Sequence, residues 1–181
     1  LKEKDKKETR KEMGVLFQGG ALFDSFTVEE NIMFPLNMFT KQSFKEKLER
    51  VNDVLSHVNL VNANSKFPAE LSGGMIKRVA IARAIAMQPR YLFCDEPNSG
   101  LDPKTAELID ELISELTHKF DMTTVINTHD MNSVLQIGQN IAFINKGELW
   151  WEGDNKEILK TDNKELNEFV FATELTRRIK R

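Results

Sequence analysis

Residues 91–97 read Tyr91-Leu92-Phe93-Cys94-Asp95-Glu96-Pro97, and this stretch decides the class of fold. Its first four residues form a short continuous apolar run, which is typical of a strand buried on both faces of a parallel sheet. Two acidic residues follow at the carboxyl end, where open α/β sheets bind their ligands. One carboxylate can hold a metal ion while the other handles a water molecule. Taken alone, an Asp-Glu-Pro stretch is as typical of a turn or a helix cap.

Downstream of this stretch, helices and strands alternate. Asp102-Pro103 is an N-cap followed by proline at the first helical position, and it predicts a helix through Leu116. A second helix is expected from about Met131. Further strands are expected at residues 123–127, 141–144 and 148–151, with two polar helices at the end. The alternation predicts an α/β fold built on a parallel sheet.

Upstream, the first twelve residues are almost all charged and predict a solvated helix or a frayed end. Met13–Phe17 is a short apolar run that we interpret as a buried strand followed by a loop. Residues 27–88 are mainly helical and should form a subdomain packed against the sheet. Within them, Ser43 and Glu46 have the spacing of a capping box at a helix start.

Bulk properties exclude several classes of protein. The 181 residues are 40% hydrophobic and 29% charged, with a net charge of −3, which gives no indication of nucleic acid as a partner. No apolar run approaches the roughly 18 residues that a membrane-spanning helix needs. The single cysteine, Cys94, excludes an internal disulfide and is interpreted as a small buried apolar residue.

A second chemical signal is Leu71-Ser72-Gly73-Gly74 at the start of a helix. Two glycines allow a ligand to approach the backbone, and free N–H groups at a helix N-terminus favour an anion. A lone Ser-Gly-Gly is more often an N-cap with a flexible turn. His129 and Gln18 each follow an expected strand, where they could reach a phosphate and a metal ion or water, but singly such residues are usually structural.

The order of these features is far more specific than any one of them. The chain contains, in sequence, Gln18, Leu71-Ser72-Gly73-Gly74, Leu92-Phe93-Cys94-Asp95-Glu96-Pro97, Ser99-Gly100-Leu101-Asp102 and His129. This series resembles the Q-loop, signature, Walker B, D-loop and switch histidine of ABC-type ATPases. The resemblance extends from about Met13 to Gly153 and implies a P-loop NTPase-like sheet with an inserted helical subdomain.

The resemblance also implies roles for individual residues. In the family, ATP and Mg²⁺ lie between two ATPase subunits, so a homodimer with composite sites is expected. One subunit would supply Gln18, Asp95, Glu96 and His129, and the other Ser72, Gly73 and Gly74. Asp95 would hold Mg²⁺ together with Gln18, Glu96 would act as the base, and His129 would contact the γ-phosphate. Asp102 would report across the dimer interface.

The same resemblance suggests an organisation of the chain and a cellular setting. Residues 1–181 would form a partial ABC ATPase domain, divided into 1–26, 27–88, 89–153 and 154–181. A transmembrane permease would dock near Gln18–Phe39, which places the protein on the cytoplasmic face of the inner membrane. In that region we expect several of Leu22, Phe23, Phe26 and Met38 to be exposed, because such a surface suits a partner. The basic residues Arg177–Arg181 are expected to form a solvated end.

Two residues depart from the common family pattern: Met75 replaces glutamine after the signature, and Asn98 replaces threonine after Asp-Glu-Pro. Together with residues 17–24 and 30–36, Met75 resembles the Mla-type branch of lipid transporters with MCE-domain partners. A hydrophobic cargo, phospholipid above all, is therefore expected.

One family element is missing from the 181 residues, because nothing in them matches the P-loop pattern G-x-x-x-x-G-K-[ST]. We therefore expect the chain to be part of a longer ATPase domain and to be inactive alone. Two alternatives remain at this stage. One is a non-catalytic fragment or interaction module, and the other is a DNA-associated ABC-type ATPase, against which the compact helical stretch and the lack of a basic patch argue.

Overall fold

The computed structural model describes residues 3–171. They form two compact units that divide between Asn127 and Thr128. The boundary falls inside the expected 89–153 segment, and the helical residues 27–88 share the first unit with the sheet. Among residues 3–171, no helix combines the length and apolar character that crossing a membrane requires.

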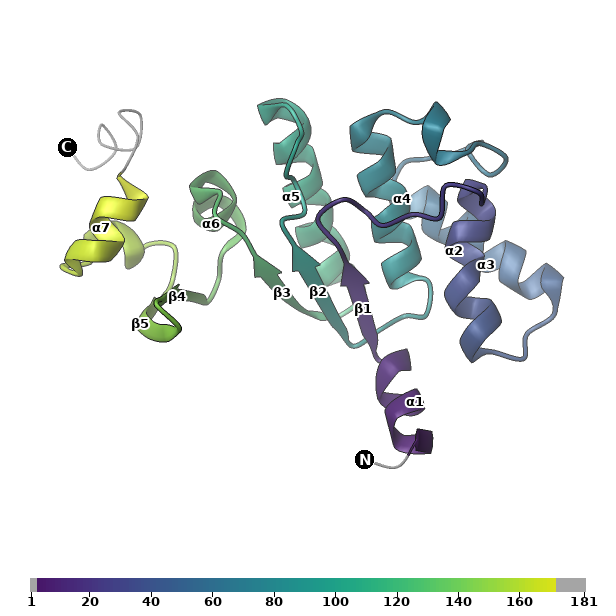
Figure 1. The fold of residues 1–181 in the computed structure, drawn as a ribbon, viewed down its shortest axis with the longest axis horizontal. Helices are drawn as coiled ribbons and strands as arrows, with labels where there is room; N and C mark the ends of the chain where they lie inside the picture. Colours follow the sequence, from purple (N-terminus) through teal and green to yellow (C-terminus); the bar gives the residue numbers. More distant parts are fainter. Residues whose placement is uncertain (1–2, 172–181) are drawn as a thin grey trace. The chain divides into compact units, whose positions relative to one another are not determined.

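The first unit is built on a three-stranded parallel sheet (Figure 1). Its strands are β1 (Met13–Leu16), β2 (Tyr91–Asp95) and β3 (Thr123–Asn127), in that order across the sheet. The pairing is in register, so that Asp95 lies opposite Asn127. The sheet confirms the predicted α/β class and brings three carboxyl strand ends to one edge.

The two faces of this sheet differ, which corrects the expectation that β1 and β2 are buried. Leu16, Leu92 and Cys94 on one face belong to the core, whose helical side is formed largely by α4 and α5. The opposite face carries exposed apolar side chains within the described chain, namely Met13, Val15, Tyr91 and Val125. A continuous apolar run therefore did not mean burial on both faces here.

Within the described residues the first unit contains six helical segments, and its longest helices surround α4. They are α1 (Glu3–Lys11), α2 (Val28–Phe39), α3 (Phe44–His57), η1 (Pro68–Glu70), α4 (Gly73–Ile85) and α5 (Pro103–Lys119), with the turn at residues 86–90 leading into β2. Contacts of α4 with α2, α3, α5 and β1 make it the central helix of the unit. Buried Val79, Ile81 and Ile85 anchor it in the core.

Helix α3 begins as the sequence predicted. The Ser43 side chain accepts a hydrogen bond from the Glu46 N–H, and the Glu46 carboxylate accepts one from the Ser43 N–H at 2.7 Å. The Ser43 hydroxyl also donates to the Glu46 carboxylate at 2.7 Å, and this bond together with the one from the Ser43 N–H holds the pKa of Glu46 below its ordinary value. Val51 and Leu55 of α3 are buried in the core, whereas Phe44 in its first turn is 65% exposed.

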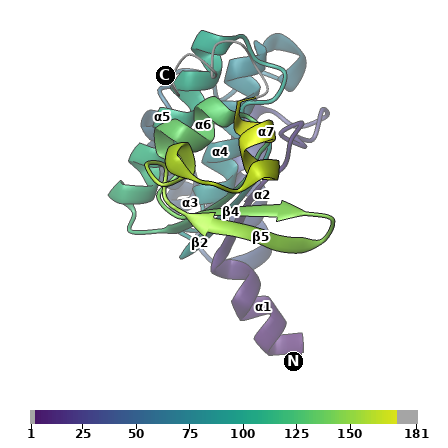
Figure 2. The ribbon, with the colours of Figure 1, turned by 90° about the vertical axis from the view of Figure 1, so that its left-hand side faces the viewer.

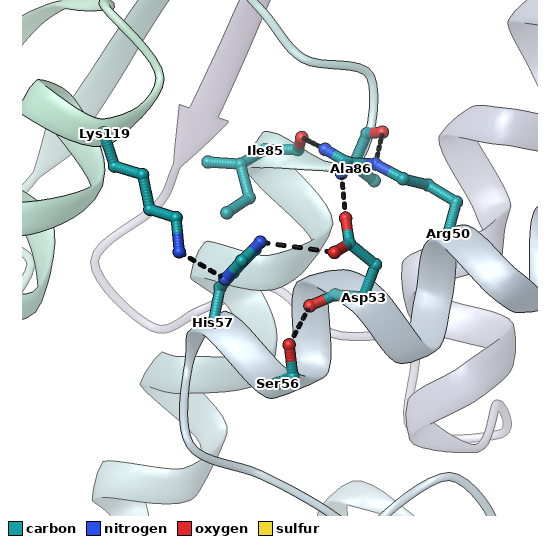
Figure 3. Close-up of polar contacts among 7 residues, drawn as sticks. All are labelled: Arg50, Asp53, Ser56, His57, Ile85, Ala86 and Lys119. Atoms are coloured by element: carbon teal, nitrogen blue, oxygen red, sulfur yellow. Dashed lines mark hydrogen bonds and ion pairs between the residues drawn. The ribbon is translucent and has the colours of Figure 1, made fainter.

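Arg50 fastens α3 to the end of α4 (Figure 3). Its guanidinium donates to the carbonyl oxygens of Ile85 and Ala86, each at 2.9 Å, and forms an ion pair with Asp53. Carbonyls at a helix C-terminus lack intrahelical partners and carry partial negative charge, so a cation there satisfies both needs.

His57, one turn after Asp53, connects the same network to α5. Its Nε2 lies 3.3 Å from the Asp53 carboxylate, and its Nδ1 lies 3.0 Å from the Lys119 ammonium nitrogen (Figure 3). The ring also meets Phe120 edge-on, with 5.2 Å between ring centres. The ends of α3, α4 and α5 are thus joined by polar contacts as well as by the core.

The second unit contains α6 (Met131–Ile137), β4 (Ile141–Asn145), β5 (Glu148–Gly153), η2 (Ile158–Lys160) and α7 (Lys164–Val170). Figure 2 shows β4 and β5 side by side as an antiparallel pair, which corrects the expectation that the later strands continue the parallel sheet. The reason is local: Lys146 and Gly147 both have positive φ, the geometry of a tight hairpin turn. Arg177–Arg181 lie outside the described residues.

Candidate functional site

The carboxyl edge of the parallel sheet gathers the acidic residues singled out in the sequence. Asp95 ends β2, and its carboxylate accepts a hydrogen bond of 2.8 Å from the Asn127 side chain at the end of β3. Because side chains alternate along a strand, Asp95 follows Tyr91 and Phe93 on the exposed face of the sheet. A carboxylate oriented by an amide is thereby presented at an exposed strand end.

Glu96 has an unusual backbone, with φ of +46°. A non-glycine residue in the left-handed region is uncommon and persists only where its surroundings hold it. Its N–H donates to the Asn127 carbonyl at 2.9 Å, and its own carbonyl accepts from Ser99 N–H and from Lys77 Nζ, each at 3.2 Å. The half-buried Glu96 side chain therefore departs from a peptide that is fixed on both sides.

Gln18 lies in the loop after β1, the strand next to β2. Its side-chain amide donates to the Ser99 hydroxyl at 3.3 Å, so it reaches the segment that follows Glu96. The main-chain carbonyl of Gln18 accepts a hydrogen bond from the ammonium group of Lys77. The first unit thus brings Gln18, Asp95 and Glu96 to one edge, where they could act on one ligand.

The Ser72-Gly73-Gly74 segment opens α4, as predicted, with the Ser72 hydroxyl accepting from Met75 N–H at 3.3 Å. The two glycines face the start of α5. A methyl group at Gly73 would lie 3.3 Å from Leu101, and one at Gly74 only 2.8 Å from Thr105. Close approach of these two helix starts therefore requires small residues.

Asp102 is the N-cap of α5, as expected from its sequence position. Its carboxylate accepts a hydrogen bond from the Thr105 N–H at 3.1 Å. Hydrogen bonding from Thr105 holds the pKa of the Asp102 carboxyl below its ordinary value. The segment from Ser99 to Asp102 therefore runs from the Gln18 contact to the start of α5.

His129 lies two residues beyond the end of β3 and is exposed. It belongs to the second unit, whereas Gln18, Asp95 and Glu96 belong to the first. Asp130 follows it and caps α6, its carboxylate accepting a hydrogen bond from the Asn132 N–H at 2.9 Å. His129 is therefore not among the residues that the first unit gathers.

Several residues that position this edge were missed in the sequence. Asn127, Lys77 and Arg83 belong to none of the motifs in the sequence. A lysine and an arginine on a largely apolar helix were the signals that could have identified the last two. A buried pair, Asn98 and Asp110, joins the loop after Glu96 to α5 through a bond of 3.1 Å. Asp110 also adds to burial in raising the pKa of the Cys94 thiol to about 12, in keeping with Cys94 as a buried apolar residue.

The apolar loop after Gln18 is exposed in part, as predicted. Phe23 and Met38 are 41% and 53% exposed, while Leu22 and Phe26 are half-buried. Phe23 packs on Phe26 and Phe34, with ring centres 5.0 and 4.8 Å apart. We call Phe23, Phe26 and Phe34 the aromatic patch; Met38 is exposed on the same helix as Phe34.

The buried Asn31 side chain holds the aromatic patch in place. It accepts from Phe23 N–H at 2.8 Å and donates to the Phe23 carbonyl at 3.1 Å. Its amide also reaches the carbonyls of Phe26 and Thr27. The Asn31 side chain thus holds the backbone of residues 23–27 through several hydrogen bonds.

A parallel sheet with acidic residues at its carboxyl edge and a glycine-opened helix beside it agrees with the P-loop NTPase type of fold, which similar solved structures share. The sequence profile of the ABC transporter family matches residues 1–99. The chain belongs to this family, and the relatives to which it is similar are ATP-binding subunits.

Among these relatives is the methionine import ATP-binding protein MetN of Protochlamydia amoebophila, 45% identical over 82% of this chain and 43% of that protein. The probable ribonucleotide transport ATP-binding protein mkl of Mycobacterium bovis is 37% identical over 90% of this chain and 45% of its own length. The chain thus spans about half the length of the curated relatives it matches.

Solved structures agree with the fold. The ATP-binding cassette MJ0796, in a dimeric post-hydrolysis state bound to ADP and Pi, is 33% identical with a TM-score of 0.75, over 86% of this chain and 68% of that one. cbiO1 from Clostridium perfringens, part of the ABC transporter complex cbiONQ, is 26% identical with a TM-score of 0.81, over 99% of this chain and 71% of that one.

Proposed function

We propose that the chain forms the Walker B and signature part of an ATP-hydrolysing subunit that powers a membrane transporter. The observation that carries this proposal is the joint placement of Gln18, Asp95 and Glu96 at adjacent carboxyl strand ends, with Glu96 held in a strained backbone. Family membership supports the same reaction.

Each group has a distinct task in this proposal. Glu96 takes the proton of the attacking water, Gln18 orients that water, and His129 donates a hydrogen bond to the γ-phosphate. Ser72, Gly73 and Gly74 bind the phosphates held by a second subunit, while Asp102 contacts that subunit. Catalysis then depends mainly on positioning and electrostatics, as phosphoryl transfer requires.

The donor set at this edge suits Mg²⁺. Asp95 offers a carboxylate and Gln18 a side-chain amide oxygen, both of the hard oxygen type that Mg²⁺ prefers. When bound with ATP, the ion would be held by Asp95 and Gln18 and would neutralise phosphate charge. Asn127 orients the Asp95 carboxylate for this task.

We infer that the P-loop comes from polypeptide outside these 181 residues. The sequence contains no match to the P-loop pattern. The exposed face of the sheet supports the inference, because parallel sheets are normally covered on both faces. Asp95 lies at the end of this same face, so a segment packed there would bring its phosphate-binding loop beside the metal ligand.

The aromatic patch supports a transmembrane permease as a partner, and hence a place on the cytoplasmic face of the membrane. Exposed Phe and Met suit an interface. The chain follows Gln18 directly into the patch, so a permease helix seated there would contact the loop that carries a catalytic group.

The cargo is proposed to be hydrophobic, with phospholipid as the first candidate, on the basis of Met75 and the residues around the Q-loop. The relatives named above transport methionine or ribonucleotide by name, and neither is a lipid. Stimulation of the ATPase of the complete transporter by phospholipid vesicles, and not by methionine, is the expected result. Stimulation by methionine alone would exclude a lipid cargo.

The catalytic proposal is tested with Glu96→Gln in the full-length subunit. Glutamine keeps the size of the side chain but cannot accept the proton, so kcat should fall by about 10²–10⁴-fold. ATP binding should persist, and ATP should stabilise a dimer. Glu107→Gln, an exposed glutamate of α5, is the matched control. A Glu96→Gln enzyme with the turnover of the control would show that Glu96 is not the base.

The partner proposal is tested with Phe23→Asp and, as a control, Phe44→Asp. Both phenylalanines are exposed, but Phe44 lies at the start of α3, away from the patch residues in sequence. Phe23→Asp should reduce co-purification with the permease while sparing ATP binding. Equal behaviour of the two variants would argue against docking at the patch.

A further inference from the structure

Lys77, in the second turn of α4, is a buried lysine with an unusual pair of partners. Only 4% of its surface is exposed. Its ammonium group donates to the Gln18 carbonyl and, at 3.2 Å, to the Glu96 carbonyl. These two carbonyls belong to the loops that follow the adjacent strands β1 and β2, so one side chain connects both loops.

Burial of a charged lysine at this position is energetically unfavourable. Removing an ammonium group from water is unfavourable, and hydrogen bonds to two neutral carbonyls offset only part of that penalty. Burial accordingly lowers the pKa of Lys77, while the nearby charge of Glu96 acts in the opposite direction. Most neighbouring positions of α4 are apolar, so core packing alone would favour a leucine or methionine.

The contacts of Lys77 explain how Glu96 keeps its strained backbone. The N–H of Glu96 is bonded to the end of β3 through Asn127, and its carbonyl is bonded to Lys77 and Ser99. With both neighbouring peptides held, the direction of the Glu96 side chain is set by the backbone. Without Lys77, one of these restraints is lost.

A second cation of the same helix continues the attachment. Arg83 donates to the carbonyls of Gly20 at 2.6 Å and Ala21 at 2.7 Å, both residues with positive φ. Lys77 and Arg83 together therefore hold the loop after β1 from Gln18 to Ala21. Ser72, the N-cap of this helix, is the residue proposed to face a second subunit.

We propose that Lys77 is a positioning residue that holds Glu96 and Gln18 in their reactive places and ties both to the signature helix α4. This proposal rests on the proposed function, since Glu96 and Gln18 have their tasks there. Lys77 itself does not need to contact ATP or the attacking water. Its removal should lower the rate of the chemical step more than the affinity for ATP.

The first test does not depend on ATPase activity. It compares the 181-residue chain with the variants Lys77→Met and Lys77→Gln, and with Lys45→Met as a control at an exposed lysine. Amide hydrogen exchange is measured at Gly20 and Ser99, whose N–H groups donate within the two loops. In Lys77→Met these amides should exchange about tenfold faster or more, the loss expected for a bond to a charged donor. Amides inside β2 and the melting temperature should change little, because the costly burial of a charge is removed as well.

The second test uses the full-length subunit with its permease. Lys77→Met should lower kcat roughly 10- to 100-fold, the usual effect of removing a group that orients a catalytic residue, with KM for ATP changed less than about threefold. Lys77→Gln keeps an N–H donor and should recover part of kcat. It also keeps the test decisive should Lys77→Met fail to fold.

The two proposals fail in different ways. If Glu96→Gln abolishes turnover while both Lys77 variants keep the kcat of Lys45→Met, Lys77 is not a positioning residue and the ATPase assignment stands. If Glu96→Gln is fully active, the assigned base is wrong. Unchanged exchange at Gly20 and Ser99 overturns the role of Lys77 whatever the activity.

Discussion

Gly14 shows how tightly β1 is packed against the end of α4. A methyl group built on Gly14 would lie 2.5 Å from the carbonyl oxygen of Ala84 and 3.1 Å from Cγ of Pro89. Ordinary contact begins at 3.4 Å, so the approach to Ala84 is about 0.9 Å too close. The obstacle is backbone, which no rotamer change can move, so Gly14→Ala must shift the strand or the helix.

Overpacking of this kind typically destabilises the folded state by about 1–3 kcal/mol. Alanine also lowers the conformational entropy of the unfolded chain, which offsets about 0.4–1 kcal/mol of that loss. Gly14→Ala should therefore lower the free energy of unfolding by roughly 1–2 kcal/mol. Urea denaturation followed by far-ultraviolet circular dichroism measures the change, because most helical residues belong to the same unit.

Gly19→Ala is the matched control. It lies five residues further on, has no heavy atom within 4 Å of the added methyl group, and does not have positive φ. Its stability should stay level or rise by a few tenths of a kcal/mol. If both variants unfold at the same urea concentration, the close contact between β1 and α4 is not as described.

Four further results are expected. Asn31→Ala should lower the free energy of unfolding by about 1–3 kcal/mol, because the loop carbonyls and N–H it serves lose their partner; an unchanged urea midpoint would contradict this. Cys94 should resist alkylation in the folded chain and react on denaturation, and rapid labelling of folded protein would show that it is not buried. Its thiol ionises near pH 9.0 when unfolded and near pH 12 when folded, so the unfolded state binds fewer protons between these values and stability should fall as pH rises through them. Purified as 181 residues, the chain should release no phosphate from ATP in the presence of Mg²⁺, and sustained turnover would refute the need for a P-loop from elsewhere.

Local signals in the sequence predicted local structure well. The capping box of Ser43 and Glu46, the N-caps Ser72 and Asp102, and the strand at residues 123–127 all form as expected. The helix starts depend on interactions within a few residues, such as a side chain bonded to the third N–H of its own helix. The order of the motifs likewise identified the family before any contact was known.

Burial and pairing were less predictable. The apolar runs around Val15 and Phe93 resemble strands covered on both sides, but coverage depends on which segments pack there, and this is not written in the run itself. The strand at 141–145 followed the expected alternation, yet the turn at Lys146-Gly147 paired it with its neighbour in sequence.

The sequence by itself determined the family, the class of fold, the helix starts and the identity of the residues proposed to act on ATP, because these follow from local chemistry and motif order. Only the tertiary structure decided how those residues are held. Asn127 orients Asp95 from 32 positions away, and Lys77 reaches the Gln18 carbonyl across 59. Such bonds join segments whose separation in sequence carries no periodic pattern. They form only because parallel strands bring their carboxyl ends to one edge and α4 crosses beside it.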